Sequence, residues 1–181
     1  ASSTQSVSVI AVDNAIFTYG GTTFCQNAAD PIPTSNLSGG TYTSTTGLVL
    51  NGTTGVIDVS ASTAGTYNVT YTTNGTCPNS STLSVTITAV GNASFSYAAS
   101  NYCQDLANPS PTITGNSGGT FSSTTGLVIN GTTGQINLTA STTGTYTVTY
   151  TTSGTCSSSA TQSVSITAGD NAIFTYGGTT F

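Results

Sequence analysis

Residues 65–71 read Gly-Thr-Tyr-Asn-Val-Thr-Tyr, a stretch in which apolar and polar side chains alternate. Alternation with a period of two places Tyr67, Val69 and Tyr71 on one face of a β-strand. The stretch recurs 79 positions later as Gly-Thr-Tyr-Thr-Val-Thr-Tyr over 144–150. Leu83, Val85 and Ile87 alternate in the same way in the next run. Both runs therefore predict half-buried strands.

The recurrence extends over the whole chain of 181 residues. Asn14-Ala15-Ile16-Phe17-Thr18-Tyr19 is related to residues 92–97 and is identical to residues 171–176. Residues 171–181 equal residues 14–24 at every position, whereas residues 92–102 match them at only 4 of 11. Each repeat of about 78 residues is too long for one coil of a solenoid and suits a small domain. A pair of unlike domains, 157 residues long, therefore forms the larger period.

The repeats predict the domain organisation. We expect residues 14–91 and 92–170 to be two complete domains. Residues 1–13 would be the last strand of a preceding repeat, and residues 171–181 the first strand of a following one. Because the chain begins without Met and overlaps itself by one element, we expect it to be a window of a longer polypeptide. Covalent continuation is favoured over exchange of end strands between subunits, and that alternative stays open.

Composition excludes most chemistry. The chain contains 26 Ser and 41 Thr but no Lys, Arg, His, Met or Trp, and its only charges are five Asp. Without His or Lys there is no imidazole base, no Schiff base and no Ser-His-Asp triad, so we expect no enzyme and no cofactor. Without a cation there is no electrostatic surface for nucleic acid or anionic membranes. No apolar run is long enough to span a membrane.

Short strands bounded by Gly, Pro, Asn and Ser predict an all-β protein. In the first repeat the pattern places about seven strands, and no segment has a helical period. Seven short strands in about 80 residues favour tandem immunoglobulin-like β-sandwich domains. In the first repeat we expect strands near 14–19, 23–28, 40–44, 47–50, 56–60, 66–73 and 82–89.

Each repeat contains one pair of cysteines at matched spacing, Cys25 with Cys77 and Cys103 with Cys156. Two Cys without His cannot complete a zinc site, so we expect no metal. One disulfide within each repeat is the preferred interpretation, in an oxidising, extracellular setting. Pairing between repeats, such as Cys77 with Cys103, stays open.

A family resemblance rests on the run over 47–57, Gly-Leu-Val-Leu-Asn-Gly-Thr-Thr-Gly-Val-Ile, and on Ala-Gly-Thr-Tyr-Asn-Val-Thr-Tyr over 64–71. These motifs resemble the immunoglobulin- and cadherin-like repeats of giant secreted surface adhesins of Bacteroidota. The resemblance covers 14–91 and 92–170. It implies a stalk or filament that holds an adhesive tip away from the cell, with neighbouring repeats or other copies as partners and a cell-surface or glycan target at the tip. The Gly-x-Tyr placement is similar to a tyrosine corner at Tyr67 and Tyr146.

The resemblance makes the junction residues candidate calcium ligands, because many cadherin-like repeats bind calcium at their junctions. The junctions are Asp13–Asn14, Gly91–Asn92 and Asp170–Asn171. Calcium takes six to eight oxygens, so one carboxylate per junction favours a capping or turn role. Asp58 is replaced by Asn137 in the sister repeat, which argues against a catalytic carboxylate.

The sequence therefore predicts an extracellular, surface-attached structural module. Two other functions remain as alternatives. Aromatic side chains could form a glycan-binding platform, although each Tyr and Phe occupies a core-like position. Threonine ranks could bind ice, although here they alternate with Tyr and Val as solvent-facing β-formers do.

Overall fold

The computed structural model describes residues 2–170, and these fold into two compact units, with the boundary between Val90 and Gly91. Their boundary falls next to the expected one at 91/92. Each unit has its own hydrophobic core, and no residue is shared between the two cores. The described residues contain strands and turns but no helix. The expected first strand of a following repeat, with Asn171, lies outside the described residues.

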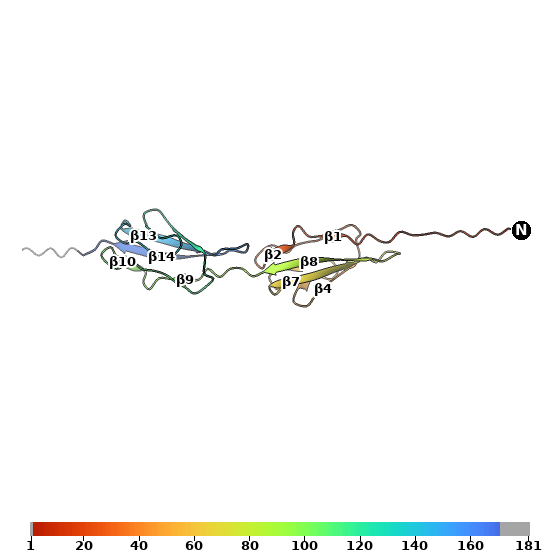
Figure 1. Ribbon diagram of the computed structural model, residues 1–181, viewed down its shortest axis with the longest axis horizontal. Helices are drawn as coiled ribbons and strands as arrows, with labels where there is room; N and C mark the ends of the chain where they lie inside the picture. Colours follow the sequence, from red (N-terminus) through yellow and green to blue (C-terminus); the bar gives the residue numbers. More distant parts are fainter. Residues whose placement is uncertain (1, 171–181) are drawn as a thin grey trace, which may run out of the picture. The chain divides into compact units, whose positions relative to one another are not determined.

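The first unit is built around a four-stranded sheet with the order β2-β8-β7-β4, in which β7 and β8 are the long strands (Figure 1). β8 is antiparallel to β7 and parallel to β2. Two short pairs, β1-β3 and β5-β6, complete the unit. The strands are β1 (Phe17–Thr18), β2 (Thr23–Cys25), β3 (Thr34–Ser35), β4 (Thr41–Ser44), β5 (Val49–Leu50), β6 (Ile57–Asp58), β7 (Gly65–Thr72) and β8 (Ser80–Thr88).

The second unit repeats this topology. Its main sheet has the order β10-β14-β13-β12, again with one parallel pair, and a short pair joins β9 to β11. An isolated bridge between Ile129 and Ile136 replaces the β5-β6 pair. The strands are β9 (Phe95–Ser96), β10 (Asn101–Cys103), β11 (Thr112–Ile113), β12 (Thr120–Ser123), β13 (Gly144–Thr151) and β14 (Ser159–Thr167). The expected all-β, immunoglobulin-like architecture of about seven strands per repeat is confirmed.

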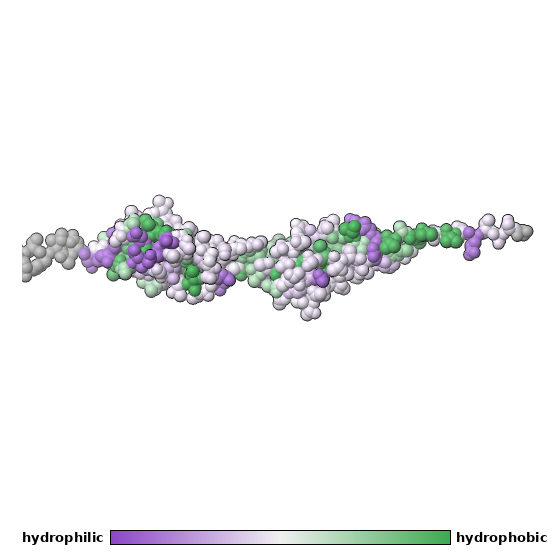
Figure 2. Space-filling model, viewed as in Figure 1, coloured by the Kyte–Doolittle hydropathy of each residue, from purple (hydrophilic) through white to green (hydrophobic). Residues whose placement is uncertain are grey.

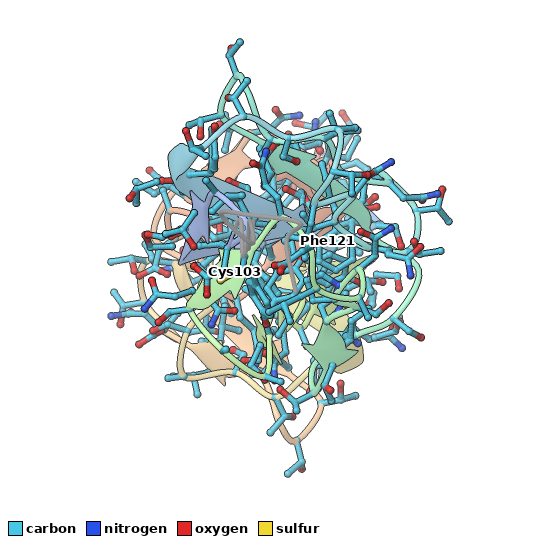
Figure 3. All side chains as sticks on the ribbon, turned by 90° about the vertical axis from the view of Figure 1, so that its left-hand side faces the viewer. Cys103 and Phe121 are labelled. Atoms are coloured by element: carbon cyan, nitrogen blue, oxygen red, sulfur yellow. The ribbon has the colours of Figure 1, made fainter. Side chains whose placement is uncertain are left out.

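Alternation along the long strands produces the core. Tyr67, Val69 and Tyr71 on β7 are buried, and so are Val85 and Ile87 on β8, as their spacing predicts. They pack against side chains of the short strands, including Phe17 and Ile57. An aromatic contact recurs in both cores. The ring centroids of Tyr42 and Tyr71 lie 4.5 Å apart in the first core, and those of Phe121 and Tyr150 lie 4.5 Å apart in the second. Phe121 is labelled in Figure 3.

The outer face of the long strands carries hydroxyl groups. Thr70 Oγ1 and Thr82 Oγ1 lie 2.8 Å apart across β7 and β8, and Thr145 Oγ1 and Ser165 Oγ lie 2.9 Å apart across β13 and β14. Cross-strand hydroxyl pairs of this kind stabilise a solvated sheet face. The resulting surface is neither strongly hydrophilic nor hydrophobic over most of its area (Figure 2).

The N-terminal segment, expected to be the last strand of a preceding repeat, forms no strand among the described residues. Within residues 4–11, Val7 and Val9 are 83 % and 93 % exposed. Figure 2 shows apolar surface along this N-terminal stretch. The reason is that a strand needs a hydrogen-bonded partner, and none of the described residues pairs with this segment.

Candidate functional site at the ends of each repeat

The N-terminal end of each repeat is tied to the loop between its two long strands. The Asp13 N–H donates to the carbonyl of Cys77 at 2.9 Å, and the Gly91 N–H donates to the carbonyl of Cys156 at 2.8 Å. Both cysteines lie in the loop that follows the first long strand, β7 in one unit and β13 in the other. One cysteine of each repeat therefore lies where the chain begins its passage through that repeat.

The other cysteine lies where the chain leaves the repeat. Cys25 ends β2 and is in register with Thr88, the last residue of β8. Cys103 ends β10 and is in register with Thr167, the last residue of β14. Cys103 is labelled in Figure 3. The Thr167 hydroxyl also lies 3.4 Å from the Cys103 sulfur.

A glutamine beside each of these cysteines anchors it to the sheet. The Gln26 N–H donates to the carbonyl of Thr88 at 3.0 Å, and its Nε2 donates to the carbonyl of Ser62 at 2.8 Å. Gln104 repeats both contacts, with Thr167 at 3.0 Å and with Ser141 at 2.7 Å. The sequence analysis missed this role, although the recurring Cys-Gln pair was a usable signal.

The expected pairing of cysteines within each repeat is wrong. Cys77 and Cys103 are free, whereas Cys25 and Cys156 are each disulfide-bonded. The reason is distance, because the two cysteines of a repeat lie at opposite ends of its longest strand. β8 spans 9 residues, roughly 27 Å at ~3.4 Å per step. A disulfide requires Cα atoms about 4.4–6.8 Å apart.

The junction residues have structural partners. Asn14 Oδ1 accepts from the Ile16 N–H at 3.1 Å, and Asn92 Oδ1 accepts from the Ser94 N–H at 3.0 Å, which forms the same local turn at both repeats. Asp13 Oδ2 is buried without a hydrogen-bond partner. Asp170 is exposed. No group of three or more His, Cys, Asp or Glu that could hold a metal ion occurs within residues 2–170.

Both tyrosine-corner candidates donate back into their own loop. The Tyr67 hydroxyl donates to the carbonyl of Thr63 at 2.8 Å, and the Tyr146 hydroxyl donates to the carbonyl of Thr142 at 2.7 Å. A second tyrosine on β7 and on β13 has a similar role, which the sequence did not predict. The Tyr150 hydroxyl accepts from the Gly119 N–H at 2.9 Å and donates to the carbonyl of Asn116 at 2.7 Å. Tyr71 makes the equivalent contacts with Gly40 and Leu37 in the first repeat.

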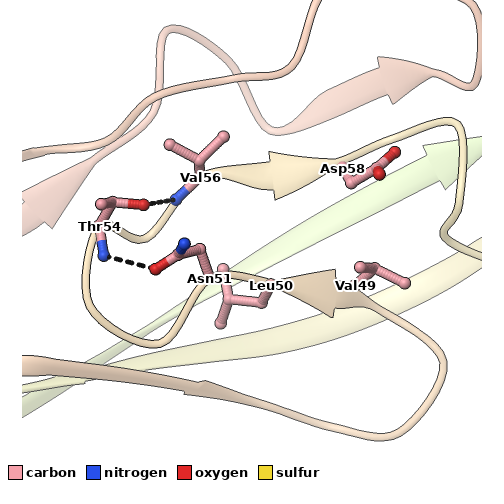
Figure 4. Close-up of a pocket in the computed structure, with 6 residues that line it drawn as sticks. All are labelled: Val49, Leu50, Asn51, Thr54, Val56 and Asp58. Atoms are coloured by element: carbon pink, nitrogen blue, oxygen red, sulfur yellow. Dashed lines mark hydrogen bonds between the residues drawn. The ribbon is translucent and has the colours of Figure 1, made fainter.

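An open hollow of about 490 Å³ lies over β5 and β6 (Figure 4). Asn51 and Asp58 are among its lining residues, and their side chains are engaged in local turns. Asn51 Oδ1 accepts from the Thr54 N–H at 2.9 Å, and Asp58 Oδ1 accepts from the Ala61 N–H at 2.9 Å. This backbone hydrogen bond from Ala61, followed by that from the Ser60 hydroxyl, lowers the pKa of Asp58.

The sister repeat explains the role of Asp58. Asn137 stands at the equivalent position, and its Oδ1 accepts from the Ala140 N–H at 3.1 Å and from the Thr139 hydroxyl at 3.0 Å. A neutral amide thus performs the same task as the carboxylate. Asp58 therefore fixes a loop, and neither proton transfer nor metal binding is needed to account for it.

Aromatic side chains do not form an outer platform in the part of the chain that the structure describes. All eight tyrosines between residues 2 and 170 are buried, and Phe24 and Phe95 are half-buried against the cores. Burial raises the pKa of Tyr19 and of Tyr97, whose hydroxyls donate inward to carbonyl oxygens of glycines. No helix within residues 2–170 is long and apolar enough to cross a membrane.

Comparisons with known proteins identify no family. No family model matches the chain, and no curated protein matches its sequence. Among solved structures, mouse cadherin-23 EC22–24 is 16 % identical, with 88 % of this chain and 68 % of that chain covered and a TM-score of 0.36. Murine CEACAM1b is 9 % identical, with 84 % and 100 % covered and a TM-score of 0.39. Human CDH23 EC21–23 is 17 % identical, with 86 % and 64 % covered and a TM-score of 0.35.

Proposed function

We propose that the chain is a structural module of an extracellular, surface-attached stalk or filament, built from tandem immunoglobulin-like repeats. One observation carries the proposal: each repeat receives the chain at one end and releases it at the other. In the first repeat the chain is fastened at Asp13 to the loop before β8, and it leaves after Thr88 at the far end of β8. Tension along the polypeptide therefore passes through the whole length of the repeat.

The parallel pair at the edge of each main sheet suits such tension. Pulling on the chain ends draws β2 toward the N-terminal end and β8 toward the C-terminal end. Their contacts, which include Phe24 in register with Ile87, then experience shear. Two flanking bonds, from the Thr86 N–H to the carbonyl of Thr22 at 2.7 Å and from Gln26 to Thr88, share this load. Bonds loaded in shear resist together, whereas bonds in an unzipped hairpin break one after another.

The surface agrees with a passive role. Neutral Thr and Ser hydroxyls cover the outer sheet face, with pairs such as Thr70–Thr82 satisfied by each other. The absence of Lys and Arg also removes every trypsin cleavage site from the chain. Neighbouring repeats or other copies are the partners that this function requires, and any adhesive target would be bound by another part of the fibre.

Single-molecule stretching tests the proposal. The full chain, kept reduced so that no disulfide contributes, is pulled either through its two ends or through bio-orthogonal handles at Thr66 and Thr86. These two residues are registered partners on β7 and β8, so the second geometry unzips the same unit. We expect a several-fold higher unfolding force through the chain ends, because unfolding under force is governed by the barrier crossed.

Two outcomes would overturn the proposal. Equal forces in the two geometries would show that the repeat is not built to resist tension along the chain. Saturable binding of the chain to a soluble oligosaccharide, abolished by unfolding, would instead favour the glycan-binding alternative.

A further inference from the structure

The sequence Asn-Gly-Thr-Thr-Gly occurs twice in the chain, at residues 51–55 after β5 and at residues 130–134 in the second repeat. Both copies contain Asn-x-Thr, the acceptor sequence for attachment of a sugar to an asparagine side chain in secreted proteins. Asn-x-Ser/Thr is frequent in this chain because Ser and Thr are abundant. It begins at Asn36, Asn51, Asn68, Asn74, Asn79, Asn92, Asn130 and Asn137. Only Asn51 and Asn130 stand at equivalent positions of the two repeats.

The two turns have the same geometry. Asn51 Oδ1 accepts from the Thr53 N–H at 3.0 Å and from the Thr54 N–H at 2.9 Å, of which Figure 4 draws the second. Asn130 Oδ1 accepts from the N–H groups two and three positions further on, both at 2.9 Å. Both asparagines are exposed, and neither Nδ2 donates a hydrogen bond to a described residue. The turn therefore holds the amide oxygen and leaves the amide nitrogen to solvent.

Turn chemistry accounts for the last two residues of the repeated sequence. Gly55 has a φ of 73°, and a Cβ there would lie 2.6 Å from Pro33 Cγ, so this position favours glycine. Thr54 Oγ1 accepts from the Val56 N–H at 3.4 Å. The same two features recur in the second repeat, at residues 134 and 133.

The amide at residue 51 and the hydroxyl at residue 53 need another explanation. The exchange of Asp58 for Asn137 between the repeats shows that a carboxylate and an amide fix a turn equally well. Residue 51 and its equivalent are nevertheless both amides. The hydroxyls of Thr53 and Thr132 are exposed and form no hydrogen bond with a described residue. An exposed amide followed two positions later by a hydroxyl is the pattern that glycosyl transfer to asparagine requires.

We propose that Asn51 and Asn130 are sites of N-linked glycosylation. A glycosyl diphosphate is the sugar donor. The Asn Nδ2 forms a bond to the anomeric carbon of the sugar, the bond between that carbon and the diphosphate oxygen breaks, and the diphosphate leaves. Nδ2 gives up one of its two protons to a base of the transferase. The assignment rests on the extracellular setting of the proposed function and not on its mechanical part.

A glycan at this turn lies beside an exposed sheet edge. β4 is an edge strand of the first main sheet, and the Tyr42 N–H donates outward to the carbonyl of Gly52, the residue after Asn51, at 2.8 Å. Phe121 on β12 donates to the carbonyl of Gly131 in the same way at 2.7 Å. Charged side chains, Lys above all, commonly protect such edges from pairing with other chains. β4 contains no charge and the chain contains no Lys, so the glycan replaces this protection.

Space for a sugar is present beside the acceptor. Asn51 lines the open hollow over β5 and β6 together with Val49, which is 46 % exposed (Figure 4). Val128, the equivalent residue of the second repeat, is 45 % exposed. The C–H face of a sugar ring is apolar, so the first sugar of the glycan can cover this valine and remove apolar surface from water.

Mass spectrometry of the full protein isolated from its natural source tests the assignment. Pepsin supplies the peptides, because the chain has no trypsin site, and electron-transfer fragmentation places each mass increment on a residue. We expect a glycan on Asn51 and on Asn130 in most molecules, and lower occupancy at the other acceptor sequences. Unmodified asparagine at both positions, or its conversion to aspartate without a sugar, would overturn the proposal. Equal occupancy at every acceptor sequence would overturn the selection by the turn.

Substitutions produced in the same source separate the modification from the turn. Thr53→Ala removes the hydroxyl but keeps the N–H that Asn51 accepts from, and we expect loss of the glycan at Asn51 with that at Asn130 retained as internal reference. Thr53→Ser should restore it. Thr54→Ala, the matched control, removes the contact with Val56 outside the acceptor sequence and should leave the glycan in place. Persistence in Thr53→Ala, or equal loss in Thr54→Ala, would contradict the assignment.

The protection of the sheet edge has its own measurement. The double variant Thr53→Ala/Thr132→Ala lacks both glycans without a change in charge, and Thr54→Ala/Thr133→Ala is its control. We expect light scattering to detect association of the first variant at several-fold lower protein concentration than the second, with circular dichroism showing the same β-structure in both. Equal association would overturn the protective role. None of these results depends on the unfolding force, so failure of the glycosylation proposal is distinguishable from failure of the mechanical one.

Discussion

Residues 4–8 and residues 161–165 have the same sequence, Thr-Gln-Ser-Val-Ser, and different structures. The second copy lies in β14, where Val164 is fully buried against the second core. The first copy has no strand partner, and Val7 is 83 % exposed. Alternation thus provides a face that can be buried, but a neighbouring strand is needed to bury it. Context, rather than local sequence, decides which copy becomes a strand.

The largest expected effect on the free energy of unfolding comes from making the same substitution at the equivalent valine of each copy. Val164→Asp places an unpaired carboxylate in the core of the second repeat, and we expect a loss of more than about 4 kcal/mol, enough to unfold that repeat. Val7→Asp makes the same change at an exposed site, and we expect a change within about 0.5 kcal/mol. Calorimetry of the two variants measures both values, with the first repeat as internal reference in Val164→Asp.

Equal damage from both substitutions would contradict the structure of residues 4–8. It would mean that this segment pairs as a strand in solution, as its sequence alone predicts. Loss of the first repeat's transition in Val164→Asp would likewise contradict the separation of the two cores.

Sequence reasoning succeeded where a long strand fixes its own face. Tyr67, Val69 and Tyr71 were placed inward from alternation alone, and they are buried. It failed where the answer depends on register between distant segments. The cysteine spacing differs by only one position between the repeats, yet spacing along the chain does not reveal that Cys25 lies beside Thr88. β3 was missed because two residues, Thr34 and Ser35, show no alternation.

A second prediction compares two glycines that share a backbone conformation but not their surroundings. Gly134 and Gly118 have φ of 71° and 82°, a region that costs an L-residue about 1–2 kcal/mol. A Cβ at Gly134 would lie 2.6 Å from Pro111 Cγ and 2.9 Å from the Phe121 ring, whereas a Cβ at Gly118 would meet nothing within 4 Å. Overpacking adds about 1–3 kcal/mol.

We therefore expect Gly134→Ala to destabilise the second repeat by about 3 kcal/mol and Gly118→Ala by about 1 kcal/mol. Chemical denaturation followed by circular dichroism measures the difference between the two free energies of unfolding. Similar losses would show that the Pro111 and Phe121 side chains move aside, so that backbone strain alone determines the effect.

The smallest expected effect concerns a position at which the two repeats differ by one charge. Hydrogen bonds from Ala61 and Ser60 lower the pKa of Asp58 in the folded state below its ordinary value. A group with a lowered folded pKa contributes stability above its unfolded pKa, and this contribution is lost as the pH falls through the folded pKa. The first repeat should therefore lose stability on acidification between those two values. The second repeat has the neutral Asn137 there and should lack this component.

Asp58→Asn is the matched variant, because the sister repeat shows that an amide accepts the same two hydrogen bonds. We expect this substitution to reduce the fall in the melting temperature of the first repeat at acidic pH. The melting temperature of the second repeat should depend on pH as before. The effect is small because Asp58 is solvated and its charge is screened. An unchanged fall in Asp58→Asn would show that another carboxyl group controls it.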